Sequence, residues 1–309
     1  YVINAWGKMR AWPRSGWAAN PSQKALLALS DLPVNVNFLS LRKIEEQGVP
    51  QDADVLLNVG EPGSAWSGDQ YWTEKTAEHV RGFVRDGGGL IGISGPALRG
   101  DEFVLSDVFG LSYQGRISEA AKAEHYRGSA RAFHQYEAPP RVSLSLSDDV
   151  PSLFDGLNEL GDIRAHVAME PQGEKVKKIG GAEGDAQRSL ATLNQFGNGE
   201  AAYISGHIDT SPYQEFLQRL IYRVAGKSDA MAQLHSPTPG AHIYYYPKAD
   251  RLFVYNRAGD DDEVKIQAGV LPQKYGRSVR LRRTYAGRAE QPPVLSKVRT
   301  LKAGDLRSA

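Results

Sequence analysis

The stretch that decides the fold is Tyr1-Val-Ile-Asn-Ala-Trp-Gly-Lys-Met-Arg-Ala-Trp-Pro-Arg-Ser-Gly-Trp17. Its first residues are apolar enough for a buried strand, and the rest is a loop that carries Trp6, Lys8, Arg10, Trp12, Arg14 and Trp17. Strand-then-helix patterns follow it, so we expect its neighbours to be parallel strands. Ligands and partners meet an open parallel sheet at the carboxyl ends of its strands, which makes this loop a candidate functional region.

The next 80 residues repeat a strand-then-helix pattern. We expect strands at Val34–Leu39, Val55–Val59 and Leu90–Ile93, and helices that begin near Pro21, after Ser40 and after Thr73. Four such repeats predict an α/β fold: a doubly wound, flavodoxin-like sheet of the class I glutamine amidotransferase type.

The pattern changes further along the chain. A polar stretch, 113–147, is interpreted as an insertion or lid, and antiparallel strands are expected at 164–169, 176–179, 189–196 and 201–205 before a helix at 212–225. The α/β domain then covers residues 1–228. A linker at 229–240, rich in Pro and Gly, leads to a small antiparallel β-sandwich domain at 241–309.

The amino-acid composition argues against several classes of function. Lys plus Arg number 37 against 36 Asp plus Glu, a balance that argues against nucleic acid or an acidic membrane as the main partner. There is no membrane-spanning apolar run. The chain has no cysteine, which excludes disulfides and thiolate metal sites and fits a cytoplasmic location. Because it opens inside a strand-like run at Tyr1, we expect a further segment upstream.

All five Trp residues lie in the first 72 positions, after the first and third expected strands. Rigid indole faces stack on sugar rings or fill another domain's pocket, although they also pack under their own loops. We therefore predict an interface or ligand surface, with an interface favoured. Its residues are Trp6, Lys8, Arg10, Trp12 and Trp17 in the first loop, and Glu61, Ser64, Trp66 and Trp72 in the second.

The second of these loops, Asn58–Gly68, is rich in glycine but does not have the three-glycine spacing of a dinucleotide fingerprint. Glu61 would also repel a phosphate. We therefore predict no cofactor.

Gly92-Ile-Ser94-Gly-Pro96 follows a strand at the position of a nucleophile elbow, and Gly206-His207-Ile-Asp209 follows a later strand. Ser94, His207 and Asp209 are thus a candidate nucleophile, base and orienting group. Pro96 argues against this, because the elbow favours a small residue there. The alternative is a serine and a histidine with no catalytic role.

No metal site is predicted. The remaining histidines show no ligand spacing, and the acidic run Asp260–Glu263 fits a solvated turn. A basic run in the second domain is interpreted as a solvated or interdomain face; it comprises Arg277, Arg280, Arg282, Arg283 and Arg288.

Three segments together resemble the middle part of the galacto-N-biose/lacto-N-biose phosphorylases, also called 1,3-beta-galactosyl-N-acetylhexosamine phosphorylases (glycoside hydrolase family 112). They are Asn4–Trp12, Asn58–Gly68 with Tyr71-Trp72, and Gly87–Gly92. The segment Ala202–Gly206 and the helix that follows are also similar to that family. The resemblance covers most of residues 1–226.

The resemblance implies an N-terminal catalytic barrel, then an amidotransferase-like domain without amidotransferase chemistry, then a β domain. It implies phosphorolysis of β-galactosyl-(1→3)-N-acetylhexosamines to α-galactose 1-phosphate, with one carboxylic acid in the barrel protonating the leaving oxygen. No residue of this chain matches that acid.

Three hypotheses follow. The first is a non-catalytic portion that supports a catalytic barrel, a homo-oligomer or both, and that meets galactoside and phosphate only through the barrel. The second is a serine hydrolase or amidase that uses Ser94. The third is a carbohydrate-binding or assembly module.

Overall fold

The computed structural model describes residues 1–4, 16–30, 32, 34–60, 71–116, 141–147, 151, 154, 157, 159–165, 167–182, 185–207 and 211–227. Beyond these it describes strands at 234–235, 241–246, 251–256, 267–268, 278–281 and 299–302. The chain divides into two units, Tyr1–Ser228 and Asp229–Ala309, each of which is described by itself.

The described part of the first unit is built on a ten-stranded sheet with the order β14-β9-β8-β11-β12-β13-β4-β3-β1-β2. Five neighbouring strands at one end run parallel: β2 (Phe38–Ser40), β1 (Val2–Asn4), β3 (Val55–Gly60), β4 (Gly89–Ser94) and β13 (Gly199–Ile204). The residues of β4 are all buried, as expected of a parallel strand covered on both faces.

The other half of the sheet is antiparallel. It comprises β12 (Asp185–Phe196), β11 (Val176–Ala182), β8 (Arg141–Leu146), β9 (Glu159–Ala165) and β14 (Gly206–His207). Two short pairs stand apart from it: β5 (Leu98–Arg99) with β6 (Glu102–Phe103), and β7 (Leu111–Arg116) with β10 (Val167–Pro171).

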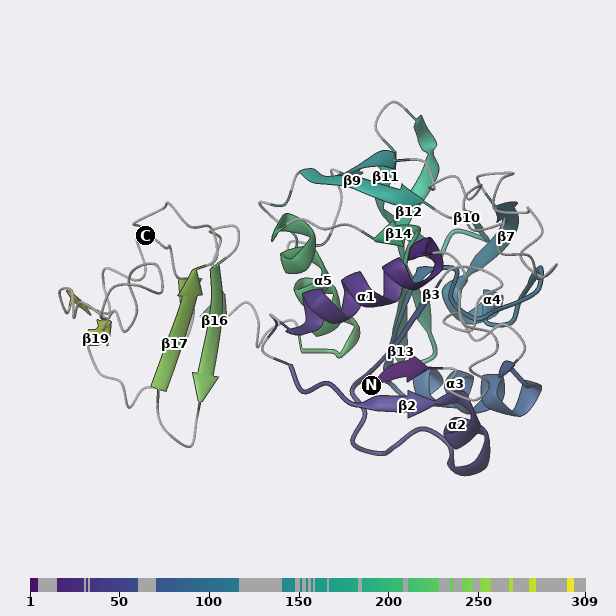
Figure 1. The fold of residues 1–309 in the computed structure, drawn as a ribbon, viewed down its shortest axis with the longest axis horizontal. Coiled ribbons are helices and arrows are strands. Elements are labelled where there is room, and N and C mark those ends of the chain that lie inside the picture. The colour runs from purple at the N-terminus through teal and green to yellow at the C-terminus, as the bar shows by residue number, and fades with distance from the viewer. Residues whose placement is uncertain are drawn as a thin grey trace. The chain divides into compact units, whose positions relative to one another are not determined.

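Helices cover both faces of this sheet. Those described are α1 (Gly16–Ser30), α2 (Leu41–Gln47), α3 (Glu74–Arg85), α4 (Ser106–Phe109) and α5 (Ser211–Val224). Helices α1 and α5 lie side by side over one face, and α2 and α3 lie on the other side (Figure 1).

The core is divided between the two faces by the alternation of side chains along each strand. Leu57 and Ile91 pack with α1 and α5, while their neighbours Leu56 and Leu90 pack with α2, α3 and α4. Full burial of each such side chain stabilises the fold by roughly 1.5–3 kcal/mol. The parallel strands are therefore the centre of both cores.

Two predicted helix starts are confirmed by their caps. Ser40 Oγ accepts a hydrogen bond from Lys43 N at 3.1 Å at the start of α2, and Thr73 Oγ1 accepts one from Thr76 N at 3.2 Å at the start of α3. Gly48 ends α2 with φ 81°, a conformation that favours glycine.

Several expected boundaries were wrong, among them the three that follow. Helix α1 begins at Gly16, so Pro21 lies inside it and removes one backbone hydrogen bond. The strand expected at 34–39 is observed only at Phe38–Ser40. The segment 113–147 is not an insertion throughout, because its ends belong to β7 and to β8, a strand of the main sheet; residues 117–140 lie outside the described part.

In the second unit the described strands form three antiparallel pairs: β16 (Ala241–Tyr246) with β17 (Arg251–Asn256), β15 (Leu234–His235) with β18 (Gln267–Ala268), and β19 (Ser278–Leu281) with β20 (Arg299–Lys302). Among the helices of the described residues, none combines the length and apolar character needed to cross a bilayer.

Candidate functional site

The first candidate site is the edge of the sheet where the parallel strands end. In this register Ile3 lies beside Asn58 and Gly60 lies beside Ser94, so β1, β3 and β4 end next to one another. Chain order also reverses here, since β2 lies on one side of β1 and β3 lies on the other. Ligands of open α/β sheets bind outside such a reversal point.

The two Trp-bearing loops of the sequence analysis start from this edge. One follows Asn4 and the other follows Gly60. Most of their predicted site residues, namely Trp6, Lys8, Arg10, Trp12, Glu61, Ser64 and Trp66, lie outside the described residues, as does the side chain of Trp17. The register therefore brings together the starts of both loops.

Trp72 is a correction to that prediction. Its side chain is only 1% exposed and packs in the core with α2 and α3. Its carbonyl accepts a hydrogen bond from Arg99 at 2.9 Å. Trp72 therefore stabilises its own domain and offers no indole face to a ligand or partner.

Buried polar groups hold the edge together. Asn58 Oδ1 accepts a hydrogen bond from Ala97 N at 2.7 Å, and Gly95 N donates to Gly60 O at 2.7 Å. The hydroxyl of Tyr203 donates to Ser94 O at 3.1 Å. The loop after β4 is thus fixed to the neighbouring strands through its backbone.

Ser94 has the backbone of a sharp strand-to-loop turn. Its φ is 70°, in the left-handed region that residues other than glycine rarely adopt. Two residues earlier, a Cβ on Gly92 would lie 2.5 Å from Pro96 Cγ, so only glycine fits there. Pro96, which argued against an elbow in the sequence, packs over this glycine.

The side chain of Ser94 is nevertheless closed off. The residue is 0% exposed, and its Oγ makes no hydrogen bond with the described residues. His207 pairs through its backbone with Arg164 of β9, while its side chain and Asp209 lie outside the described residues. The structure thus places Ser94 in a buried position, and the rest of the candidate triad lies outside the described residues.

Among the described residues, no group of three or more His, Cys, Asp or Glu side chains is arranged to hold a metal ion. Within the described part of the chain the buried charged side chains lie on α5, where Arg219 and Glu215 form an ion pair. Burial raises the pKa of the Glu215 carboxyl, against the opposing effect of Arg219.

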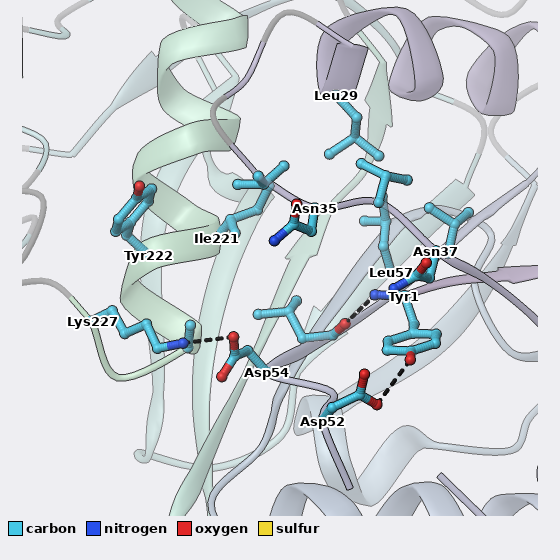
Figure 2. Close-up of a pocket in the computed structure, with 15 residues that line it drawn as sticks. Tyr1, Leu29, Asn35, Asn37, Asp52, Asp54, Leu57, Ile221, Tyr222 and Lys227 are labelled. Atoms are coloured by element: carbon cyan, nitrogen blue, oxygen red, sulfur yellow. Dashed lines mark hydrogen bonds and ion pairs between the residues drawn. The ribbon is translucent and has the colours of Figure 1, made fainter. Parts of the chain in front are cut away.

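A second candidate site, which sequence reasoning missed, is a hollow at the opposite, amino-terminal edge of the same strands (Figure 2). We call it the amino-edge hollow. It has a volume of about 590 Å³, and its lining comes from β1, the end of α1, residues 34–37, the turn before β3, and the end of α5. No local pattern marks it, because these segments meet only in the folded chain.

Three contacts shape the hollow. The Tyr1 hydroxyl donates to Asp52 Oδ1 at 2.8 Å, the Tyr1 amino group donates to Val55 O at 2.7 Å, and Lys227 Nζ lies 2.6 Å from Asp54 Oδ2. Desolvation by burial raises the pKa of the Tyr222 phenol, against the opposing charge of Lys227.

Comparison with known proteins identifies the family of residues 1–229. The model described as lacto-N-biose phosphorylase central domain matches residues 1–229. A 1,3-beta-galactosyl-N-acetylhexosamine phosphorylase of Lachnoclostridium phytofermentans is 26% identical over 283 residues, which cover 87% of this chain and 36% of the relative. The phosphorylase of the same name from Bifidobacterium longum is 26% identical over 302 residues, covering 86% of this chain and 38% of the relative.

A D-galactosyl-beta-1->4-L-rhamnose phosphorylase of Lachnoclostridium phytofermentans is 25% identical over 277 residues, covering 86% of this chain and 34% of the relative. The chain therefore spans just over a third of the length of these relatives.

Among solved structures, the beta-galactosidase from Rahnella sp. R3 aligns with a TM-score of 0.50 and 15% identity, covering 97% of this chain and 40% of that one, which is a likeness of fold alone. Because the central-domain model matches residues 1–229 of 309, this chain belongs to the lacto-N-biose phosphorylase family.

Proposed function

We propose that this chain is a non-catalytic, supporting part of a phosphorylase that acts on β-1,3-linked galactosyl-N-acetylhexosamines. Two relatives carry that activity in their names, and the segment that matches here covers only 36% and 38% of their length. The observation that carries the proposal is the burial of Ser94. This residue is the candidate nucleophile of the sequence analysis, and a buried hydroxyl is not accessible to a substrate.

The proposal also includes the surface on which the catalytic portion docks. The loops after Asn4 and Gly60 start at the reversal point of the sheet, and their Trp and basic residues suit a docking surface for a catalytic domain or for a second copy of the chain. Galactoside and phosphate then meet this chain only through the catalytic portion.

We also propose that the first unit has the doubly wound, amidotransferase-like fold. The order β2-β1-β3-β4-β13 of its parallel strands, with helices on both faces, supports this. A β-sandwich is proposed for the second unit, in line with its antiparallel pairs.

The test is phosphorolysis by the purified chain. The purified chain is incubated with lacto-N-biose or galacto-N-biose and inorganic phosphate, and we expect it to release no α-galactose 1-phosphate. The Bifidobacterium longum relative is the active control. Release of the sugar phosphate by the purified chain would overturn the proposal.

The serine hydrolase alternative has one observation in its favour, the left-handed backbone of Ser94. A serine-directed phosphonate probe distinguishes it. Labelling of the folded chain that Ser94→Ala abolishes would establish a reactive serine; we expect no labelling, because the hydroxyl is buried.

A further inference from the structure

We propose that the edge strand β2 pairs with β2 of a second copy of this chain. Among the described residues β2 pairs only with β1, so its other side is an open edge of the ten-stranded sheet. An open edge offers unpaired backbone groups to another strand, and proteins usually protect it with charged residues or proline. The run Val34-Asn-Val-Asn-Phe-Leu-Ser40 contains neither.

Exposed apolar side chains come from this edge and from α1, the helix over the same face of the sheet. Phe38 and Leu27 are each 58% exposed and Val36 is 37% exposed, and no other large apolar side chain of the residues with described burial is exposed. Phe38 also lines a small gap with Ala25 and Leu26 of α1, which places it on the face that α1 covers. An exposed aromatic ring with aliphatic neighbours is typical of the centre of an interface.

The exposed residues of α1 and of the β2 segment carry no charge. Those described are Gln23, Leu27, Ser30, Asn35, Val36, Asn37 and Phe38. The charged residue of α1, Lys24, is half-buried, whereas α2 exposes Arg42, Lys43 and Glu46. A two-fold axis places each residue near it opposite its own copy, so a charge there would repel itself. An uncharged surface therefore suits a second copy of the chain.

The direction of the backbone sets the register of such a pair. Asn37 O accepts a hydrogen bond from Val2 N at 2.8 Å, so the backbone N–H and C=O of the next residue, Phe38, point away from β1. In an antiparallel pair centred on Asn37, Phe38 of each copy exchanges hydrogen bonds with Val36 of the other. Apolar side chains then lie opposite each other, and Asn37 faces its own copy with an amide that can both donate and accept.

The same short patch supplies both sides of this contact, which makes a second copy the occupant that the observations favour. The patch is smaller than the roughly 20–30 residues that each partner contributes to a standard interface, so we expect weak association, with a Kd on the order of 10–100 μM. It lies apart from the loops after Asn4 and Gly60, and the result of the phosphorolysis assay does not bear on it.

The first measurement is sedimentation of the whole chain at concentrations from about 1 μM to about 500 μM, which bracket the expected Kd. We expect a monomer at the lowest concentration and a dimer at the highest. Phe38→Lys places a charge on the edge strand and should weaken the dimer by roughly tenfold or more. Gln172→Lys adds the same charge at an exposed position after β10 and should leave the dimer unchanged.

The second measurement traps the pair covalently. The chain has no cysteine, so Asn37→Cys introduces a single thiol. Opposite residues of a non-hydrogen-bonded antiparallel pair have Cα atoms about 4.5 Å apart, a separation that a disulfide can span. Mild oxidation should therefore convert Asn37→Cys largely to a disulfide-linked dimer, and Gln172→Cys, an exposed thiol elsewhere, much less.

Circular dichroism shows whether each variant is folded, and Asn37→Cys keeps the test decisive if Phe38→Lys does not fold. A chain that stays monomeric over the whole concentration range overturns the proposal and leaves this edge to a different kind of partner. Dimerisation of folded Phe38→Lys like that of the unmodified chain, or cross-linking of Asn37→Cys no greater than that of Gln172→Cys, also overturns it, because the copies then meet through another surface.

Discussion

Ser94 and Ser22 are both buried serines, but their hydroxyl groups differ in what they contact. Ser22 Oγ donates to Val59 O at 2.9 Å, whereas Ser94 Oγ makes no hydrogen bond with the described residues and its backbone has φ 70°. A buried hydroxyl without a partner loses its hydration without compensation. The two residues therefore form a matched pair for mutation.

We expect Ser94→Ala to leave the free energy of unfolding unchanged or to raise it, because the unpaired hydroxyl is removed while the backbone stays the same. Ser22→Ala should lower it by about 1 kcal/mol, because Val59 O loses its side-chain donor. Urea unfolding of both variants measures the difference. A larger loss for Ser94→Ala than for Ser22→Ala would mean that the Ser94 hydroxyl makes a stabilising contact.

Glu215 provides a pH prediction. Burial raises the pKa of its carboxyl in the folded state, so between the unfolded and folded pKa values the folded chain binds more protons than the unfolded chain. The contribution of Glu215 to stability must then fall as pH rises through that window.

The free energy of unfolding measured from about pH 4 upward should show this effect. Relative to Glu215→Gln, the unmodified chain should lose stability as the pH rises. Glu46→Gln, which removes an exposed carboxylate on α2, is measured beside it as the control for the loss of one acidic group. Identical pH profiles for the unmodified chain and Glu215→Gln would contradict the assignment.

At the scale of elements, Thr73 connects two helices. It caps α3 through Thr76 N and donates to Glu45 of α2 at 2.9 Å. Thr73→Ala should therefore lower the free energy of unfolding by about 1–2 kcal/mol.

Thr73→Ser retains the hydroxyl and is the matched control, with a smaller expected loss. Chemical denaturation distinguishes the two variants. Equal losses would show that the methyl group, and not the cap, is what matters at this position.

At the scale of the whole molecule, the two units should unfold separately. The first unit, Tyr1–Ser228, nearly coincides with the match of the family model to residues 1–229. We expect a chain that ends at Ser228 to fold, and its calorimetric Tm to lie within a few degrees of a transition of the full chain. Failure of this shorter chain to unfold cooperatively would show that it needs the second unit.

Much of the parallel half was predictable from the sequence, because its signals are local. The apolar run at Val55–Val59 and the caps at Ser40 and Thr73 depend on near neighbours, and the structure has them where they were expected. Boundaries were less reliable, since Pro21 marks a favoured helix start but α1 continues on its N-terminal side.

The sequence by itself determined that apolar strands alternate with capped helices at the start of this chain, because spacing and capping act over a few residues. Only the tertiary structure decided that Trp72 is core, that Ser94 is closed to solvent, and that Asn35, Asp54 and Tyr222 line one hollow. Burial depends on which distant segments cover a residue, and the residues of a hollow are brought together by the order of strands in the sheet. Neither is encoded in the local pattern of the chain.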